Sequence, residues 1–281
     1  MKEREKCRCG VPSVSVIIPT YNMGGYVSDA IGSVLKGGID DLEVIVVDDG
    51  SEDFTSYIAK KYTDPSSELY DPRVYYDWQK NQGKSAAVNH GLEISRGEYV
   101  TMLDADDQLP SGSLKARYEA RFDASGEPSD VIVGGFEVFD YSGTQGTRSS
   151  PEVGDPQWLH DHFYLGWKTP FHLNACLLSF DLVNRVGGLD ESLHRCIDGD
   201  YALRLLRAAK TVQVVDSIVY RYRKHRSSPL KRMRYRLKTA RYRPRVIWKN
   251  YEGWRRWLGV PFGIAMDGGK LVYELFGKYK T

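Results

Sequence analysis

The stretch YVTMLDADD, residues 99–107, joins an apolar segment to a cluster of acidic residues that follows it directly. Its first five residues have the content expected of a buried β-strand. Asp104, Asp106 and Asp107 then stand at the carboxyl end of that strand. This stretch therefore predicts a strand that delivers carboxylates to one edge of an α/β sheet.

Three apolar stretches that precede it have the same character. We predict strands over residues 14–18, 42–47 and 74–78, and helices over residues 26–35, 53–62 and 85–95 between and after them. Such alternation is typical of an open, mostly parallel, Rossmann-like central sheet with helices on both faces. Polar residues 20–22 and 48–51 follow the first two strands. Because such sheets bind ligands at the carboxyl ends of their strands, we expect a site there.

The second half of the chain is less regular. The pattern predicts strands over residues 130–141 and 212–220, a polar loop over 142–155 and a helix over 200–209. Further on, Leu230, Met233, Leu237 and Ala240 recur at steps of three and four residues. This spacing predicts an amphipathic helical extension, which Pro244 should kink or end.

Charge is distributed unevenly along the chain. Residues 1–220 hold 21 Lys and Arg against 34 Asp and Glu, whereas residues 221–257 hold 15 Lys and Arg and one acid, Glu252. With its interspersed Tyr and Trp, this basic segment favours peripheral association with an anionic membrane surface. The alternative is a helix that is solvated or packs on the acidic body. We expect no nucleic-acid partner, because nothing else in the chain supports one.

Other features restrict the class of protein. The four cysteines are too few for a disulfide framework, and Cys7 and Cys9 lack the second Cys/His pair of a zinc site. Residues 1–8 are charged and do not resemble a signal peptide. No apolar run reaches the ~18 residues that span a bilayer. We therefore predict a cytoplasmic protein, free or peripheral on the inner face of the membrane.

Asp104 and Asp106 are the candidates for metal chemistry. The chain has neither a Gly-rich dinucleotide motif after its first strand nor a P-loop, so a bound diphosphate would need another source of positive charge. Two carboxylates one residue apart can hold Mg²⁺ or Mn²⁺, whose remaining ligands are typically phosphates and water. Such a metal stabilises a departing diphosphate. The alternative is a solvated turn or a helix cap.

Four motifs in order resemble the family-two inverting glycosyltransferases of GT-A fold: VSVIIPTYN (14–22), VVDDGS (46–51), NQGK (81–84) and LDADD (103–107). The resemblance covers residues 13–226. It implies a nucleotide-sugar donor, Mg²⁺ or Mn²⁺, a saccharide or lipid-linked acceptor, and inversion at the anomeric carbon in one displacement.

The same resemblance divides the chain into segments. It implies a flexible N-terminus over residues 1–12, a nucleotide-sugar-binding half over 13–107 and an acceptor-binding half over 108–226. A basic amphipathic helical extension would occupy residues 227–281.

The donor site implied by the resemblance consists of Pro19, Thr20, Tyr21, Asp48, Lys84, Asp104, Ala105 and Asp106. Tyr21 matches the position against the base, and Asp48 matches the carboxylate that accepts from the base imide, which favours UDP without excluding GDP. Asp106 matches the direct metal ligand, with Asp104 beside it. His225 is a further candidate for the metal or diphosphate, or a solvated side chain.

The general base implied by the resemblance is Asp198. The residue before it is Ile197 where the family has an acid, so Asp200 stays open as an alternative. Candidate acceptor contacts are Gly134, Gly135, Phe136, Trp167, His172 and Asn174.

Two other functions are weighed against sugar transfer. A sugar-nucleotide nucleotidyltransferase would carry a basic residue in the loop after the first strand, and residues 22–25 (NMGG) have none. A non-catalytic nucleotide- or carbohydrate-binding relative is disfavoured because Asp104, Asp106 and Asp198 are all present.

Overall fold

The computed structural model describes residues 12–152, 154–165, 171–225, 228–253 and 257. The predicted flexible N-terminus lies outside these residues except for Pro12, and so does Trp167. The strands are β1 (Val14–Thr20), β2 (Leu42–Asp48), β3 (Val74–Trp78), β4 (Tyr99–Met102), β5 (Val131–Asp140), β6 (Gly143–Arg148), β7 (Cys176–Ser179) and β8 (Val212–Arg223). The helices are α1 (Val27–Leu35), α2 (Thr55–Lys61), α3 (Lys84–Ile94), α4 (Ser113–Glu119), α5 (Pro156–Leu165), the short 3-10 helix η1 (Leu173–Ala175), α6 (Phe180–Val186), α7 (Ile197–Ala208) and α8 (Pro229–Asn250).

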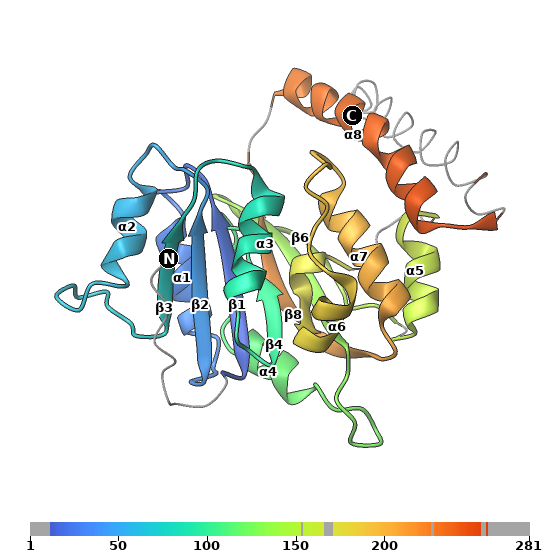
Figure 1. The fold of residues 1–281 in the computed structure, drawn as a ribbon, viewed down its shortest axis with the longest axis horizontal. Helices are drawn as coiled ribbons and strands as arrows, with labels where there is room; N and C mark the ends of the chain where they lie inside the picture. Colours follow the sequence, from blue (N-terminus) through green and yellow to red (C-terminus); the bar gives the residue numbers. More distant parts are fainter. Residues whose placement is uncertain (1–11, 153, 166–170, 226–227, 254–256, 258–281) are drawn as a thin grey trace.

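These strands form one mixed sheet in the order β3-β2-β1-β4-β7-β5-β6, and β8 pairs with β5 (Figure 1). The pairs β1–β2, β1–β4, β2–β3 and β5–β8 are parallel. Strand β7 runs antiparallel to both β4 and β5, and β6 runs antiparallel to β5. The predicted α/β class with a mostly parallel sheet is therefore confirmed.

Helices cover both faces of the sheet. Alternate side chains of each strand point to opposite faces, and apolar side chains on each face pack against helices. Val16 and Ile18 of β1 pack in one cluster with residues of α1, α2 and α4. Ile17, between them, belongs to a second cluster with residues of α3, α5, α6 and α7. The mostly apolar character of β1 is explained by this burial on both sides.

The parallel register brings the polar strand ends together. Thr20 at the end of β1 is aligned with Asp48 at the end of β2. Strand β4 lies on the other side of β1, and its Met102 is aligned with Ile17. The loop with Asp104, Asp106 and Asp107 therefore opens beside the end of β1.

Several element boundaries differ from the prediction, and three of the differences bear on the site or the sheet. Strand β1 continues through Pro19 to Thr20, in register with β2. The predicted polar loop contains β6, which forms because its backbone pairs with β5 although its side chains are exposed. Helix α7 begins at Ile197, which places Asp198 and Asp200 both in its first turn.

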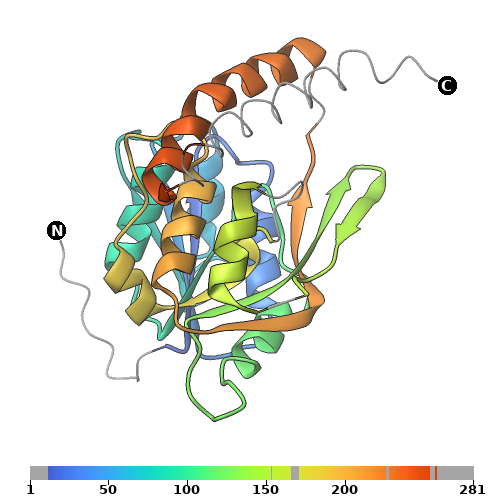
Figure 2. The ribbon, with the colours of Figure 1, turned by 90° about the vertical axis from the view of Figure 1, so that its right-hand side faces the viewer.

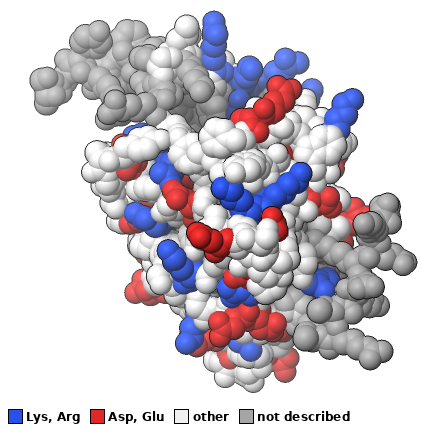
Figure 3. All heavy atoms as spheres, turned by 90° about the vertical axis from the view of Figure 1, so that its left-hand side faces the viewer, with Lys and Arg blue, Asp and Glu red and all other residues white. Residues whose placement is uncertain are grey.

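A helix, α8, lies at the start of the predicted extension, and Pro244 lies inside this helix and does not end it. Both views show α8 across one end of the molecule (Figures 1 and 2). The side chains it buries are Val246, Ile247 and, just beyond its end, Tyr251. Leu230 and Leu237 of the predicted apolar face are more than half exposed. On the face in Figure 3, acidic and basic side chains are interspersed, with basic ones at the end that carries α8.

Candidate active site

A cavity of about 490 Å³ opens at the carboxyl ends of β1, β2 and β4, within the size range of ligand sites. It is lined by Pro19, Thr20, Tyr21, Met23, Asp49, Asn81, Gly83, Lys84, Ala87, Asp104, Ala105 and Asp106. Seven of the eight residues predicted for the donor site therefore line one cavity. The hydroxyl oxygen of Thr20 is buried there without a hydrogen-bond partner among the described residues, so it can bond a ligand.

Asp48 is the predicted donor residue that does not line the cavity. Its side chain is fully buried, and its two oxygens accept hydrogen bonds from the Ser51 amide (2.8 Å) and the Tyr76 hydroxyl (2.8 Å). The carboxylate at the cavity wall is that of Asp49, which accepts from Gln79 Nε2 and from the amides of Gln82 and Gly83. Of the two adjacent aspartates, the structure thus places Asp49, and not the predicted Asp48, at the cavity wall.

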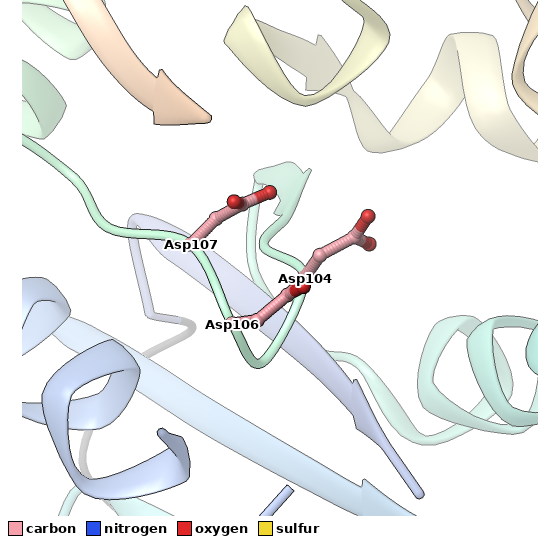
Figure 4. A group of neighbouring side chains, drawn as sticks. All are labelled: Asp104, Asp106 and Asp107. Atoms are coloured by element: carbon pink, nitrogen blue, oxygen red, sulfur yellow. The ribbon is translucent and has the colours of Figure 1, made fainter. Parts of the chain in front are cut away.

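Three carboxylates cluster on the loop after β4. One oxygen from each of Asp104, Asp106 and Asp107 lies within 4.8 Å of the others, and Asp104 and Asp107 point to the same side of the loop (Figure 4). Asp107 is buried, and its oxygens accept from the Tyr220 hydroxyl and from the Arg223 amide (2.6 Å). Burial, followed by the neighbouring Asp104, raises the pKa of Asp107 to about 8. This geometry places three carboxyl groups where a bound cation would stabilise their ionised forms.

The cluster fits a hard divalent cation. Carboxylate oxygens are the ligands that Mg²⁺ and Mn²⁺ prefer, and here three are available from one short loop. His225 lies at the same place, with Nε2 2.7 Å from Asp106 Oδ2. The structure therefore brings the three predicted metal residues, Asp104, Asp106 and His225, together and adds Asp107 to them.

Lys84 connects this cluster to the first turn of α7. Its ammonium nitrogen lies 2.8 Å from Asp104 Oδ1 and 3.5 Å from Asp198 Oδ1. Burial acts to lower the pKa of Lys84, but the two carboxylates outweigh it and hold that pKa above its usual value. Burial likewise acts to raise the pKa of Asp104, and Lys84 lowers it overall. The pair is thus charged, with Asp198 beside it.

Asp198 and Asp200 have opposite environments. The Asp198 side chain is 45% exposed and lies next to Lys84. Asp200 is fully buried and accepts hydrogen bonds from Arg204 Nε (2.9 Å) and Asn250 Nδ2 (2.9 Å). Asp198 is therefore the carboxylate that a substrate can reach, whereas Asp200 is held inside the protein.

The candidate acceptor contacts divide into two groups. Gly134 and Gly135 are packing positions: an added Cβ would lie 2.7 Å from the Val219 side chain and 2.6 Å from the Arg148 carbonyl oxygen. His172 and Asn174 lie nearer the site, where His172 stacks on Tyr220 and Asn174 Nδ2 donates to the Tyr220 hydroxyl. Burial lowers the pKa of His172, although Asp198 and Asp104 act to raise it. The neutral imidazole stays available as a hydrogen-bonding group.

Four residues that line the cavity, belong to the acidic loop or contact it were not selected as site residues from the sequence: Asp49, Asp107, Tyr220 and Arg223. Asp49 and Asp107 belong to the motifs VVDDGS and LDADD, so the sequence motifs could have pointed to them. Tyr220 and Arg223 belong to β8, and both contact the acidic loop more than 100 residues earlier: Arg223 Nε donates to the Asp106 carbonyl oxygen at 2.6 Å. No local pattern reveals such a contact.

Comparison with known proteins identifies the family. The sheet order, the helices on both faces and the site at the strand ends define a GT-A glycosyltransferase fold, and solved GT-A structures align with almost the whole chain. The family model "Glycosyl transferase family 2" matches residues 15–187. The chain belongs to glycosyl transferase family 2.

Curated relatives include two bacterial glycosyltransferases. The chain is 28% identical over 231 residues to the uncharacterized glycosyltransferase EpsJ of Bacillus subtilis, covering 78% of this chain and 63% of EpsJ. It is 32% identical over 130 residues to glycosyltransferase GlyG of Streptococcus pneumoniae, covering 46% of this chain and 40% of GlyG. The chain thus spans less than two thirds of the length of these relatives.

Two solved structures share the fold. The complex of S. aureus TarS 1–349 with UDP-GlcNAc aligns with a TM-score of 0.63 at 19% identity, covering 96% of this chain and 76% of TarS 1–349. The mannosyltransferase PcManGT of Pyrobaculum calidifontis, in complex with GDP-Man and Mn²⁺, gives a TM-score of 0.63 at 19% identity, covering 95% and 74%. Within the described residues, no helix combines the length and apolar character needed to span a bilayer.

Proposed function

We propose that this chain transfers a sugar from a nucleoside-diphosphate sugar to a saccharide or lipid-linked acceptor, with inversion at the anomeric carbon. The observation that carries the proposal is the cavity itself, because it is lined by Asp104 and Asp106 of the carboxylate cluster and by Lys84, whose ammonium group lies next to Asp198. The family match supports sugar transfer over nucleotidyl transfer or binding without catalysis.

Each part of the site has a chemical task in this proposal. Asp104, Asp106 and Asp107 would hold Mg²⁺ or Mn²⁺, with His225 against Asp106. The bound metal supplies positive charge for the diphosphate leaving group. Lys84 adds a fixed positive charge and holds Asp104 in place. Asp198 takes the proton of the acceptor hydroxyl as it attacks, which is the work of a general base.

We propose uracil as the base, although the ring N–H of guanine could donate to the same carboxylate. Asp49 already accepts three hydrogen bonds, and a carboxylate has about four lone-pair sites, so one remains for a ring N–H. Tyr21 is half exposed beside it and offers a face for stacking. Calorimetry with UDP and GDP in the presence of Mn²⁺ tests this assignment. We expect tighter binding of UDP, and tighter binding of GDP would refute the base assignment without touching the class of reaction.

The reaction class is tested with water as the acceptor. Purified protein with Mn²⁺ is incubated with UDP-glucose, UDP-galactose, UDP-N-acetylglucosamine or GDP-mannose, and release of the nucleoside diphosphate is measured. We expect slow release that requires Mn²⁺ and is lost in Asp104→Asn but kept in Asp64→Asn, an exposed carboxylate away from the cavity. A nucleotidyltransferase would instead release pyrophosphate from a nucleoside triphosphate and a sugar phosphate.

We also propose that α8 binds an anionic membrane surface on the cytoplasmic side. Along this helix, Leu230, Arg234, Leu237, Arg241 and Trp248 recur at steps that place them on one face, and all five are exposed. Apolar and basic side chains on one exposed helical face suit the headgroup region of a bilayer. Binding of α8 to the membrane would bring a lipid-linked acceptor close to Asp198.

Liposome sedimentation tests the membrane proposal. Each Lys or Arg near an anionic surface contributes about 1 kcal/mol, so reversing Arg234, Arg241 and Arg245 to Glu should weaken binding to phosphatidylglycerol vesicles by at least ~10²-fold. The matched control reverses the exposed Lys36, Lys80 and Lys115, which changes net charge equally. Equal loss in both triple variants, or no sedimentation of the wild type, would refute a role for α8.

A further inference from the structure

The end of α8 is tied to the first turn of α7 by a buried polar contact that the proposed chemistry does not use. Asn250 Nδ2 donates to Asp200 Oδ1 at 2.9 Å and to the carbonyl of Val246, in its own helix, at 3.0 Å. Both Asn250 and Asp200 are buried. Lys249 adds contacts to Asp190 (2.8 Å) and Asp200 (3.4 Å). A polar contact in such a place is stronger than one at the surface.

The first turn of α7 needs such an external restraint. Its N-cap residue, Cys196, has a left-handed backbone (φ 59°) and makes no side-chain capping hydrogen bond. A helix start without a cap leaves backbone N–H groups unpaired and frays more easily. Asp198 stands in this turn, and its charged neighbour Lys84 is 3.5 Å away and belongs to a different helix.

The remaining contacts connect α7 to α3, the helix that carries Lys84. Asn89 of α3 bonds both the amide (2.7 Å) and the carbonyl (3.0 Å) of Leu189. Arg204 of α7 in turn donates to the carbonyl of Gly188 at 2.8 Å. Helix α7 is therefore fixed to α3 through residues 188–189 and to α8 through Asp200. These two attachments set where Asp198 lies relative to Lys84.

We infer that Asn250 is a positioning residue for Asp198, so that α8, beyond the end of the family-model match at residue 187, is part of the catalytic apparatus. This inference rests on the proposed role of Asp198 as general base. Asp198 and Asp200 lie in one helical turn, so a shift at Asp200 moves both. Displacement of a reacting group by about 1 Å can cost ~10²-fold in rate.

The test compares Asn250→Ala with Tyr251→Phe. The control removes a buried hydrogen bond from the adjacent residue, but that bond goes to the carbonyl of His160 in α5 (2.7 Å), away from Asp200. Both variants should lower the melting temperature to a similar degree. We expect Asn250→Ala to lower kcat for Mn²⁺-dependent hydrolysis, measured with the nucleotide sugar that the wild type hydrolyses fastest, by about tenfold with KM within twofold. Tyr251→Phe should keep its kcat.

A double-mutant cycle separates positioning from general destabilisation. If Asn250 acts through Asp198, then adding Asn250→Ala to Asp198→Asn should cause no further loss. Equal losses of kcat in Asn250→Ala and Tyr251→Phe, or a further tenfold loss in the double variant, would overturn the inference. Full activity of Asp198→Asn would overturn the proposed base and the inference with it. Full activity of Asn250→Ala beside an inactive Asp198→Asn would overturn the inference alone.

Discussion

Asp107→Asn should change the stability of the protein in opposite directions with and without metal. In the metal-free protein Asp107 is buried next to Asp104, and its pKa is raised from 3.8 to about 8. The folded protein therefore holds this proton at a pH at which the unfolded chain has lost it. The stability that this group contributes is present below about pH 4 and is lost as the pH rises toward 8.

The size of the effect follows from the shift. Each pKa unit corresponds to about 1.4 kcal/mol, so the upper limit at pH 9 is about 6 kcal/mol. Relaxation and water entry around clustered carboxylates reduce such values, and we expect about 2 kcal/mol. Asp107→Asn removes the charge while keeping the size of the side chain. Without metal, its stability relative to wild type should therefore increase between pH 5 and pH 9.

Metal should reverse this order. Mn²⁺ at 100 times its dissociation constant stabilises the wild type by about 2.7 kcal/mol through mass action. The variant has lost one of three carboxylates, so its gain should be smaller. The assay is chemical unfolding followed by circular dichroism in EDTA at pH 5, 7 and 9, and then in Mn²⁺ at pH 7. A difference in EDTA that is the same at all three pH values, or an equal gain from Mn²⁺ in both proteins, would contradict this reasoning.

Three further predictions concern turnover and binding. Asp106→Ala should abolish Mn²⁺-dependent hydrolysis of nucleotide sugars with a far-ultraviolet circular dichroism spectrum like that of wild type; near-normal turnover would remove Asp106 from the metal site. Asp198→Asn should lower kcat by roughly 10²-fold or more with donor affinity close to normal, as measured by calorimetry. If Asp200→Asn is inactive while Asp198→Asn stays active, then Asp200 and not Asp198 is the general base. Asp49→Asn should weaken UDP binding about tenfold, since a group that accepts hydrogen bonds is replaced by one that also donates; unchanged affinity would show that Asp49 does not contact the base.

The parallel half of the sheet could be predicted because its signals are local. Residues 14–18 are apolar at every position except Ser15, and such a stretch is typical of a central strand that is buried between two layers of helices. The polar residues that end each strand then meet at one edge. For this reason seven of the eight predicted donor residues line the same cavity.

The placement of Asp49, rather than Asp48, at the cavity wall shows where this reasoning stops. Successive strand residues point to opposite faces, so only one of two adjacent aspartates is expected to face the cavity. Which of them does so depends on where the strand ends and on its neighbours in space. The Tyr76 hydroxyl of β3 donates a hydrogen bond to Asp48. The loop amides of Gln82 and Gly83 donate hydrogen bonds to Asp49.

The same kind of argument applies to Asp198 and Asp200, which lie on a helix instead of a strand. Two residues that are two positions apart point roughly 200° away from each other, so one carboxylate at most can face the cavity. The sequence alone shows that the two carboxylates cannot both face the cavity. It does not show which of them does, because both residues are aspartates in one helical turn. The contacts that hold Asp200 come from about 50 residues later: the buried Asn250 donates to it, and the exposed Lys249 lies 3.4 Å from it. Asp200 is thus held inside by its buried partner, while Asp198 stays partly exposed beside Lys84. If Asp198 is the base that we propose, the extension after β8 bears on the chemistry of the site.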